Sequence, residues 1–280
     1  MKIKDTDIDK IRRIVADEVY AAVGAAGVKS RDAVTPSSLA KYIDHTLLKP
    51  EATVDEVRNI CEEAKRYHFA SVCVNSCYIK FVSDSLAGSG VNPCCVAGFP
   101  LGAMMPEAKA AEALCSANNG AKEIDMVINV GAVKSGDWKL VFRDIEGVVK
   151  AVQGRAIVKV ILETCLLTDE EKVKACTVCK LAGAHFVKTS TGFSKGGATV
   201  EDVKLMRGTI GPDMGLKASG GVRTYEDAVK MIEAGATRLG TSSGVTLVSG
   251  DNDAGNKCVH CGSCETECPS GRVVVLKGLY

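Results

Sequence analysis

Short apolar runs alternate with amphipathic segments along most of this chain. The runs are rich in Val, Ile, Leu and Ala, are too short for core helices, and are typical of buried parallel strands. They predict eight strands, at Tyr42–Asp44, Ala70–Val74, Asn92–Ala97, Glu123–Val127, Ile157–Leu162, His185–Thr189, Met214–Ala218 and Arg238–Gly240. Apolar residues at helical spacing predict helices between them, at Val54–Tyr67, Ile79–Leu86, Pro106–Asn118, Trp138–Val152, Glu170–Leu181, Val200–Gly208 and Thr224–Ala234.

This alternation predicts an α/β fold. Eight strands that take turns with helices over about 200 residues favour a closed (β/α)8 barrel of the TIM type. A doubly wound open sheet is the alternative, but no G-x-G-x-x-G run follows the first predicted strand. We therefore expect a barrel domain at residues 39–248, with an N-terminal helix before it and a Cys-rich tail at residues 249–280.

The N-terminal segment, residues 1–24, reads as an amphipathic helix followed by a linker at residues 25–38. Ile8, Ile11, Val15 and Val19 form one apolar stripe, and polar residues fill much of the opposite face. Such a helix either docks against the barrel or lays its apolar face in the groove of a partner. It resembles the short N-terminal helices that direct enzymes into bacterial microcompartments, which makes a scaffold or microcompartment a candidate partner.

The composition narrows the class of protein. A formal net charge of +1 provides no field that would favour nucleic acid or a membrane surface. The first residues lack the apolar core of a signal peptide, and no run of 18 apolar residues could span a bilayer. We therefore expect a cytoplasmic protein, with neither nucleic acid nor a membrane as a partner.

Three lysines recur at the same place in successive strand–helix repeats. Lys159, Lys188 and Lys217 are each 29 residues apart, and each lies among apolar residues of a predicted strand. Three solvated surface lysines are the alternative interpretation. If the three converge inside a barrel, each ammonium opposes the charging of its neighbours, which favours one neutral amine. A neutral lysine amine is a nucleophile toward carbonyls.

Carboxylates and glycine-rich loops complete this pattern. Asp125 lies within the fourth predicted strand, where a buried carboxylate beside lysines is a charge partner or a general acid or base. Asp44 ends the first strand, and capping of a loop or helix is its alternative role. The last two strands lead into Ser219-Gly220-Gly221 and Thr241-Ser242-Ser243, at the position where barrel enzymes frequently bind phosphate. These features predict a phosphorylated carbonyl compound as the substrate.

Five ordered motifs are similar to those of the 2-deoxyribose-5-phosphate aldolase family. They are Ile43–Pro50, Glu123–Asn129, Lys159–Cys165, Val187–Phe193 and Lys217–Thr224. The resemblance covers roughly residues 38–248. It implies a class I, metal-independent aldolase that reversibly cleaves 2-deoxy-D-ribose 5-phosphate to D-glyceraldehyde 3-phosphate and acetaldehyde, with no cofactor for the aldol chemistry. We also expect a homo-oligomer, either a dimer or a tetramer.

The resemblance assigns catalytic roles residue by residue. Lys188 would form the Schiff base with the substrate carbonyl, and Lys217 would be the nearby cation that lowers the pKa of Lys188. Asp125 would donate and accept protons through a water molecule. Lys159 would hold the proton network.

The resemblance also assigns binding roles. Asp44 and Thr46 are implied to line the hydroxyl side of the substrate. Cys73 matches a cysteine on the second strand at the active site of the family. Those implied to hold the phosphate are Gly192, Gly220, Gly221, Ser242 and Ser243. Some family members have a lysine after the Thr-Gly pair where this chain has Phe193, which implies a weaker grip on phosphate. Packing is the alternative role for Cys73.

Four of the 13 cysteines stand apart from the barrel. Cys258, Cys261, Cys264 and Cys268, followed by Pro269, have the C-x2-C-x2-C-x3-C-P spacing of bacterial ferredoxins. They predict a [4Fe–4S] cluster, with zinc as the alternative. The other nine read as small buried hydrophobes, including the C-x-x-C pair of Cys176 and Cys179. Tyr280, the last residue printed, is a candidate for proton transfer because some members of the family end in a tyrosine.

Overall fold

The computed structural model describes residues 34–249. Eight parallel strands follow one another around a closed barrel, and β8 pairs with β1 through Ile43 and Leu239. The strands are β1 Ile43–Leu47, β2 Ser71–Val74, β3 Asn92–Ala97, β4 Glu123–Val127, β5 Ile157–Ile161, β6 Phe186–Lys188, β7 Gly215–Ser219 and β8 Arg238–Thr241. Closure of the sheet confirms the predicted (β/α)8 barrel and excludes the doubly wound alternative.

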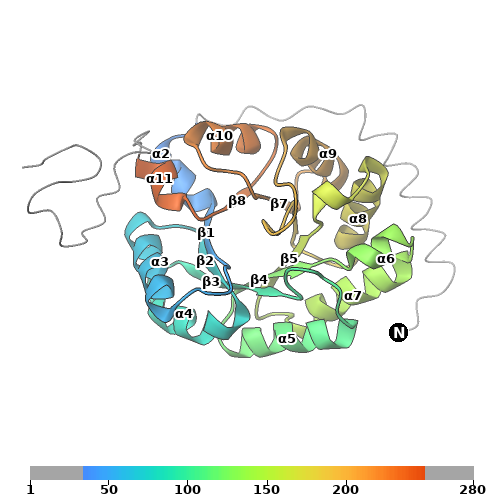
Figure 1. The fold of residues 1–280 in the computed structure, drawn as a ribbon, viewed down its shortest axis with the longest axis horizontal. Coiled ribbons are helices and arrows are strands. Elements are labelled where there is room, and N and C mark those ends of the chain that lie inside the picture. Colours follow the sequence, from blue (N-terminus) through green and yellow to red (C-terminus); the bar gives the residue numbers. More distant parts are fainter. Residues whose placement is uncertain (1–33, 250–280) are drawn as a thin grey trace, which may run out of the picture.

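A ring of helices surrounds the strands (Figure 1). The longer helices are α3 Val54–Tyr67, α5 Pro106–Asn118, α7 Trp138–Ala151, α8 Asp169–Leu181, α9 Val200–Ile210 and α10 Tyr225–Glu233. The shorter ones are α2 Pro36–Leu39, α4 Ile79–Ser85, α6 Val130–Lys134 and α11 Gly244–Ser249. Three 3₁₀ turns, η1 Ala40–Tyr42, η2 Ser76–Tyr78 and η3 Thr164–Leu166, complete the described elements. No helix in this part of the chain is both long and apolar enough to cross a membrane.

Local sequence explains where the helices begin. The Thr53 side chain accepts a hydrogen bond from the Glu56 N–H, and the Glu56 carboxylate accepts one from the Thr53 N–H. Thr168 and Glu171 form the same reciprocal pair at the start of α8. Each pair satisfies backbone donors that the first turn of a helix leaves unpaired. The polar connections of the chain therefore fix the start of the helices that cover the barrel.

The two faces of each strand differ in chemistry. Cys95 belongs to the large apolar core, whereas Cys94 packs with Leu48, Cys73 and Val96 in a small separate cluster. The adjacent side chains of Cys94 and Cys95 therefore face opposite sides of β3. The interior of the barrel is otherwise charged, because Asp44, Asp125 and the three lysines singled out by their spacing are all buried.

Cys176 and Cys179 lie in α8, where both side chains are fully buried. Burial raises the pKa of both thiols, which keeps them protonated and unreactive. The structure therefore agrees with packing as the role of this C-x-x-C pair.

The predicted N-terminal helix of residues 1–24 lies outside the described residues. The predicted boundaries of the domains stay predictions.

Candidate active site

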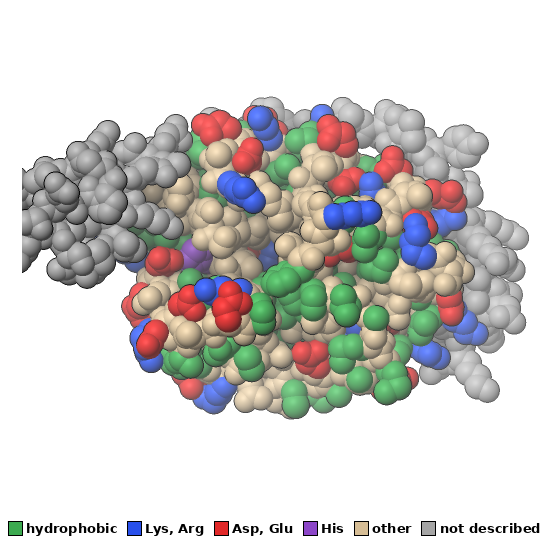
Figure 2. Space-filling model, viewed as in Figure 1, with side chains coloured by type: hydrophobic (Ala, Val, Ile, Leu, Met, Phe, Trp, Pro, Cys, Tyr) green, Lys and Arg blue, Asp and Glu red, His purple; other side chains and the backbone are tan. Residues whose placement is uncertain are grey.

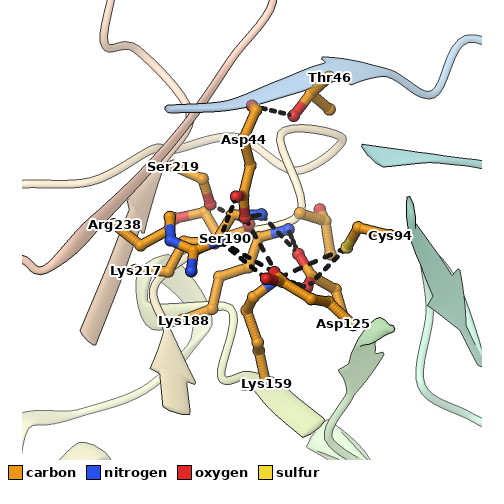
Figure 3. Close-up of polar contacts among 12 residues, drawn as sticks. Asp44, Thr46, Cys94, Asp125, Lys159, Lys188, Ser190, Lys217, Ser219 and Arg238 are labelled. Atoms are coloured by element: carbon orange, nitrogen blue, oxygen red, sulfur yellow. Dashed lines mark hydrogen bonds and ion pairs between the residues drawn. The ribbon is translucent and has the colours of Figure 1, made fainter. Parts of the chain in front are cut away.

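Asp125 lies on β4 inside the barrel, surrounded by lysines from the next three strands (Figure 3). Its Oδ1 accepts a hydrogen bond from Lys159 Nζ at 2.8 Å. Its Oδ2 accepts from Lys188 Nζ at 2.8 Å and from Lys217 Nζ at 2.7 Å. Burial alone would raise the pKa of Asp125, but the charges of the three lysines hold it well below its ordinary value. The carboxylate is therefore ionised and holds the three amines together, as their spacing predicted.

Further carboxylates compensate two of the lysines. Lys159 Nζ also lies 2.6 Å from Glu123 and 3.2 Å from Asp44, and Lys217 Nζ lies 2.5 Å from Asp44. Burial would lower the pKa of Lys159 and of Lys217, but the carboxylates around them raise both above the ordinary value. These two side chains are therefore permanent ammonium ions at neutral pH.

Lys188 has a different environment. In residues 34–249, Asp125 is its one ion-pair partner, and that carboxylate is shared with two other lysines. Register pairs Lys188 with Lys217 on the neighbouring strand, so the two amines face the same interior. Lys188 is therefore the lysine of the three with the least compensation for a positive charge.

A cavity of about 380 Å³ adjoins the network at Lys188. The other predicted site residues that line it are Thr46, Gly192, Gly220, Gly221, Ser242 and Ser243. Asp44, Asp125, Lys159 and Lys217 are fully buried and are absent from its lining. Lys188 is thus the predicted catalytic side chain that a molecule in the cavity would meet.

The glycine-rich side of the cavity has the backbone that an anion site requires. Gly192, Gly220 and Gly221 have φ values of +88°, +80° and +85°, in the left-handed region that favours glycine. A Cβ on Gly220 would also lie 3.0 Å from the Cα of Gly197. Lys49 and Arg223 add cations to the lining, although Lys49 is paired with a glutamate at 2.6 Å. Backbone donors and cations together suit a phosphate group.

Hydrogen bonds hold the loop that follows β6. The Glu163 carboxylate accepts from the N–H and the hydroxyl of Thr191, and the Ser219 hydroxyl donates to the carbonyl of Ser190 at 2.6 Å. The Thr189 hydroxyl donates to the carbonyl of Ser219 at 3.1 Å. These contacts join the ends of β5, β6 and β7 and fix the backbone between Lys188 and Gly192.

Aromatic and aliphatic side chains lie at the mouth of the barrel. Phe193, in the cavity lining, is half exposed and meets Phe99 edge-on with 5.3 Å between ring centroids. Leu101 and Met105, in the loop after β3, are also exposed. Figure 2 shows hydrophobic side chains gathered near the middle of this face of the molecule. Phe193 therefore puts an apolar ring at the cavity, at the position after the Thr-Gly pair where a lysine would add a positive charge.

Three predicted binding residues have distinct places. Asp44 is part of the buried ion network rather than of the cavity wall. Thr46 lines the cavity, and its hydroxyl donates to the backbone carbonyl of Asp44 at 2.8 Å. Cys73 is fully buried, and a hydrogen bond from the Cys94 thiol lowers its pKa despite burial.

The sequence reasoning missed Glu123, Arg238 and Cys94. Glu123 pairs with Lys159, Arg238 Nη1 pairs with Asp44 at 2.6 Å, and the Cys94 thiol lies 3.4 Å from Asp125. One signal was available for Glu123. It lies two residues before Asp125 on the same strand, so period-two alternation turns both side chains to the same face.

Ligand atoms of Cys73, Cys94 and Asp125 all lie within 4.8 Å of one another, a spacing that could hold a metal ion. Both oxygens of Asp125, however, already accept hydrogen bonds from lysines, and a divalent cation there would be repelled by the ammonium groups of Lys159 and Lys217. These contacts favour the carboxylate as the partner of lysines.

The predicted cluster ligands Cys258, Cys261, Cys264 and Cys268, and Tyr280, lie outside the described residues.

Comparison with known proteins decides the family. Residues 38–250 match the DeoC/LacD family aldolase. The chain belongs to this aldolase family. The deoxyribose-phosphate aldolase of Streptococcus gordonii is 62% identical over 218 residues, which cover 78% of this chain and 99% of that protein. The deoxyribose-phosphate aldolase of Enterococcus faecalis is 61% identical over 217 residues, with the same coverage.

Solved structures whose names are those of deoxyribose-phosphate aldolases share the fold. A structure from Coccidioides immitis aligns with a TM-score of 0.82 and 40% identity, and covers 86% of this chain and 96% of its own. The deoxyribose phosphate aldolase of Aeropyrum pernix, described as a tetramer, aligns with a TM-score of 0.72 and 37% identity, covering 85% of this chain and 96% of its own. The match of sequence and fold extends over the whole barrel that carries the lysine network.

Proposed function

We propose that the protein is a class I deoxyribose-phosphate aldolase, which cleaves 2-deoxy-D-ribose 5-phosphate reversibly to D-glyceraldehyde 3-phosphate and acetaldehyde. Relatives of that name match the barrel over 99% of their own length. The observation that carries the assignment is Lys188, a lysine that lines the cavity and shares its carboxylate with two other lysines. Such an amine is suited to attack a carbonyl.

The reaction begins on the open-chain form of the sugar. The neutral amine of Lys188 attacks the C1 aldehyde, and loss of water from the resulting carbinolamine gives a protonated imine. Asp125, 2.8 Å from Lys188 Nζ, passes protons between the nitrogen and the departing hydroxyl through a water molecule.

The protonated imine then withdraws electrons from the neighbouring bonds. A base removes the proton of the C3 hydroxyl, the C2–C3 bond breaks, and its electron pair enters the enamine formed on Lys188. D-Glyceraldehyde 3-phosphate leaves first. Protonation of the enamine at C2 and hydrolysis of the imine release acetaldehyde and restore the amine.

The surrounding charges divide the remaining roles. Lys217 and Lys159 stay charged, since carboxylates raise their pKa values, and their ammonium groups oppose a further positive charge on Lys188. Asp44 holds both lysines in place from β1. The remaining binding roles are proposals as well. Thr46 contacts the hydroxyl side of the sugar, and Cys73 packs in the same cluster as Leu48, which lines the cavity.

The phosphate binds at the glycine-rich side of the cavity. Gly192, Gly220 and Gly221 provide backbone donors there, and Ser242 and Ser243 add hydroxyl groups. This arrangement holds the sugar with its phosphate away from the lysine network and its aldehyde at Lys188. No metal or organic cofactor takes part in the proposed steps.

Lys188→Arg tests the assignment. The guanidinium cannot form the imine, so cleavage of 2-deoxyribose 5-phosphate should fall to the background rate. Lys80→Arg is the matched control, because Lys80 is exposed on α4 and pairs with Asp84. Full activity of Lys188→Arg in a folded protein would contradict the proposed function.

We further propose that Cys258, Cys261, Cys264 and Cys268 bind a [4Fe–4S] cluster, on the ferredoxin-like spacing alone. The aldol reaction is redox neutral, so the cluster would serve structure, oxygen sensing or docking to an electron-transfer partner. Anaerobic purification should yield iron and sulfide, which Cys264→Ser loses and the exposed-residue control Cys115→Ser keeps. Stoichiometric zinc, or neither metal, would contradict the cluster.

Residues 1–24 are proposed as a recruitment helix that binds a scaffold or a microcompartment. Deleting them should disperse the protein in cells and leave aldolase turnover unchanged. An unaltered distribution would reject recruitment.

The described domain is proposed to form a homo-oligomer, in line with the tetrameric relative from Aeropyrum pernix. Light scattering of the purified protein reports the mass, and a monomer would contradict this proposal.

A further inference from the structure

Arg238 connects three strands across the interior of the barrel. It begins β8, and its register partner on β7 is Lys217. Its Nη1 donates to Asp44 Oδ1 at 2.6 Å and to Glu123 Oε2 at 2.9 Å, on β1 and β4. The side chain is mostly buried. A guanidinium that donates to two carboxylates inside a barrel holds both carboxylates in fixed positions.

Each of these two carboxylates also contacts a lysine of the site. Asp44 uses Oδ1 for Arg238 and Oδ2 for Lys217, which lies at 2.5 Å. Glu123 Oε2 contacts Arg238 and also Lys159, which lies at 2.6 Å. Burial would raise the pKa of Asp44, but the cations on both sides, Arg238 among them, hold it well below the ordinary value. Arg238 therefore acts on the lysines through two carboxylates.

Every strand contributes a titratable or charged group to this interior. In strand order they are Asp44, Cys73, Cys94, Glu123, Asp125, Lys159, Lys188, Lys217 and Arg238, with two from β4. Without Lys188, the charged groups in this set are three cations and three carboxylates. The interior is thus electrically balanced when Lys188 is a neutral amine, and Arg238 is required for that balance.

We propose that Arg238 is a positioning residue that, through Asp44 and Glu123, keeps the interior balanced so that Lys188 rests as the neutral nucleophile. This rests on the proposed function, in which Lys188 forms the imine. Arg238 does not touch the substrate cavity. Loss of its charge leaves two cations facing three carboxylates, and the surplus negative charge then favours the protonated form of Lys188.

Arg238→Met tests the proposal, with the exposed Arg58→Met as the matched control for a lost charge. The readouts are the pH dependence of kcat/KM and the rate at which borohydride traps the enzyme with acetaldehyde. In Arg238→Met, the acid limb of both profiles should move to higher pH by roughly one unit. At pH values well below the acid limb, trapping should then slow by about tenfold, since there one unit changes the fraction of neutral amine tenfold.

Removing the negative charge of Glu123 distinguishes an electrostatic role of Arg238 from a structural one. Glu123→Gln alone should move the acid limb to lower pH. If Arg238→Met does not fold, this shift tests whether the charge balance controls Lys188. The double variant Arg238→Met/Glu123→Gln restores equal numbers of charges, so its acid limb should return toward that of the unaltered protein. A purely structural role for Arg238 would lower stability or kcat without such a reversal.

Two results would overturn the proposal. One is an acid limb that does not move in folded Arg238→Met or, where that variant does not fold, in Glu123→Gln. The other is a double variant whose limb stays displaced. Failure of the proposed function itself has a different signature, because the unaltered protein would then trap no acetaldehyde at Lys188.

Discussion

Lys188 differs from its two neighbouring lysines in the carboxylates around it. Lys159 contacts three carboxylates and Lys217 contacts two, whereas Lys188 pairs with Asp125 alone among the described residues. The same interior therefore holds two permanent ammonium ions and one amine that is poorly compensated when charged. This asymmetry supports the proposal that Lys188 is the reactive lysine among the three buried ones.

Asp125 should be hard to replace, because all three lysines contact its carboxylate. In Asp125→Asn, three lysines lose their shared carboxylate and the route for proton transfer, so turnover should fall by about 10² to 10⁴-fold. Removing one member of a buried ion network should also lower the free energy of unfolding by about 3–5 kcal/mol. Steady-state kinetics and urea denaturation measure the two effects, with exposed Asp84→Asn as the control. Turnover within a few-fold of the unaltered protein would refute the role.

Sequence reasoning found the lysines and Asp125 because charged residues are rare in runs of buried strand. It missed Arg238, since a residue at the first position of a strand reads equally well as a solvated end. The pairing of Arg238 with Asp44, 194 residues away, and with Glu123, 115 residues away, depends on closure of the barrel. Periodicity along one strand does not contain that information.

At the scale of elements, Lys109 holds the loop after β3 against the barrel. This lysine of α5 is fully buried, and its Nζ donates to the carbonyls of Gly102 at 3.1 Å and Val127 at 2.8 Å. It also pairs with Asp144 of α7 at 2.5 Å. One side chain thus links α5, α7, β4 and a loop beside the cavity.

Lys109→Met should leave the Asp144 carboxylate buried and unpaired, and should lower the free energy of unfolding by about 3–5 kcal/mol near neutral pH. Burial raises the pKa of Asp144, so the folded state binds a proton more readily than the unfolded state does. Stability of the variant should therefore recover as pH falls toward about 4, the ordinary value for aspartate. Denaturation at several pH values measures this.

The double variant Lys109→Met/Asp144→Leu serves as the control for the buried charge. It removes both ionic groups, so its stability should exceed that of Lys109→Met and lose most of the dependence on pH. A single variant whose stability does not change with pH would show that Asp144 is not the source of the loss.

Most elements could be predicted because their periods are clear. The bounds of α3, α5, β3 and β4 agree with the prediction, and the other strands differ by a few residues at most. The prediction missed α2, α6 and α11, which have 4, 5 and 6 residues and are too short to show a helical period. Helix α2 begins within the predicted linker at residues 25–38. Asn129 caps α6 by accepting from the Ala132 N–H, a local contact that hydrophobic patterning does not reveal.

At the scale of the whole molecule, the aldolase and the cysteine run occupy separate parts of the chain. The family match ends at residue 250, and the first cysteine of the run is Cys258. The proposed chemistry uses lysines and a carboxylate of the barrel alone. The proposed cluster therefore need not take part in the aldol chemistry.

Removing metal should thus leave the aldol reaction unchanged. After anaerobic purification, oxidative removal of the proposed cluster followed by a chelator should abolish iron content and keep kcat and KM for 2-deoxyribose 5-phosphate within twofold. Reconstitution with iron and sulfide provides the control for damage during treatment. Loss of turnover that reconstitution restores would show that the tail takes part in catalysis.

Covalent trapping tests the central claim most directly. Borohydride reduction in the presence of acetaldehyde should inactivate the protein and add one ethyl group per chain. Peptide mass spectrometry should place that group on Lys188, with Lys159 and Lys217 unmodified. Label on another lysine, or no label in a protein that cleaves the sugar, would contradict the assignment of Lys188 as the imine-forming residue.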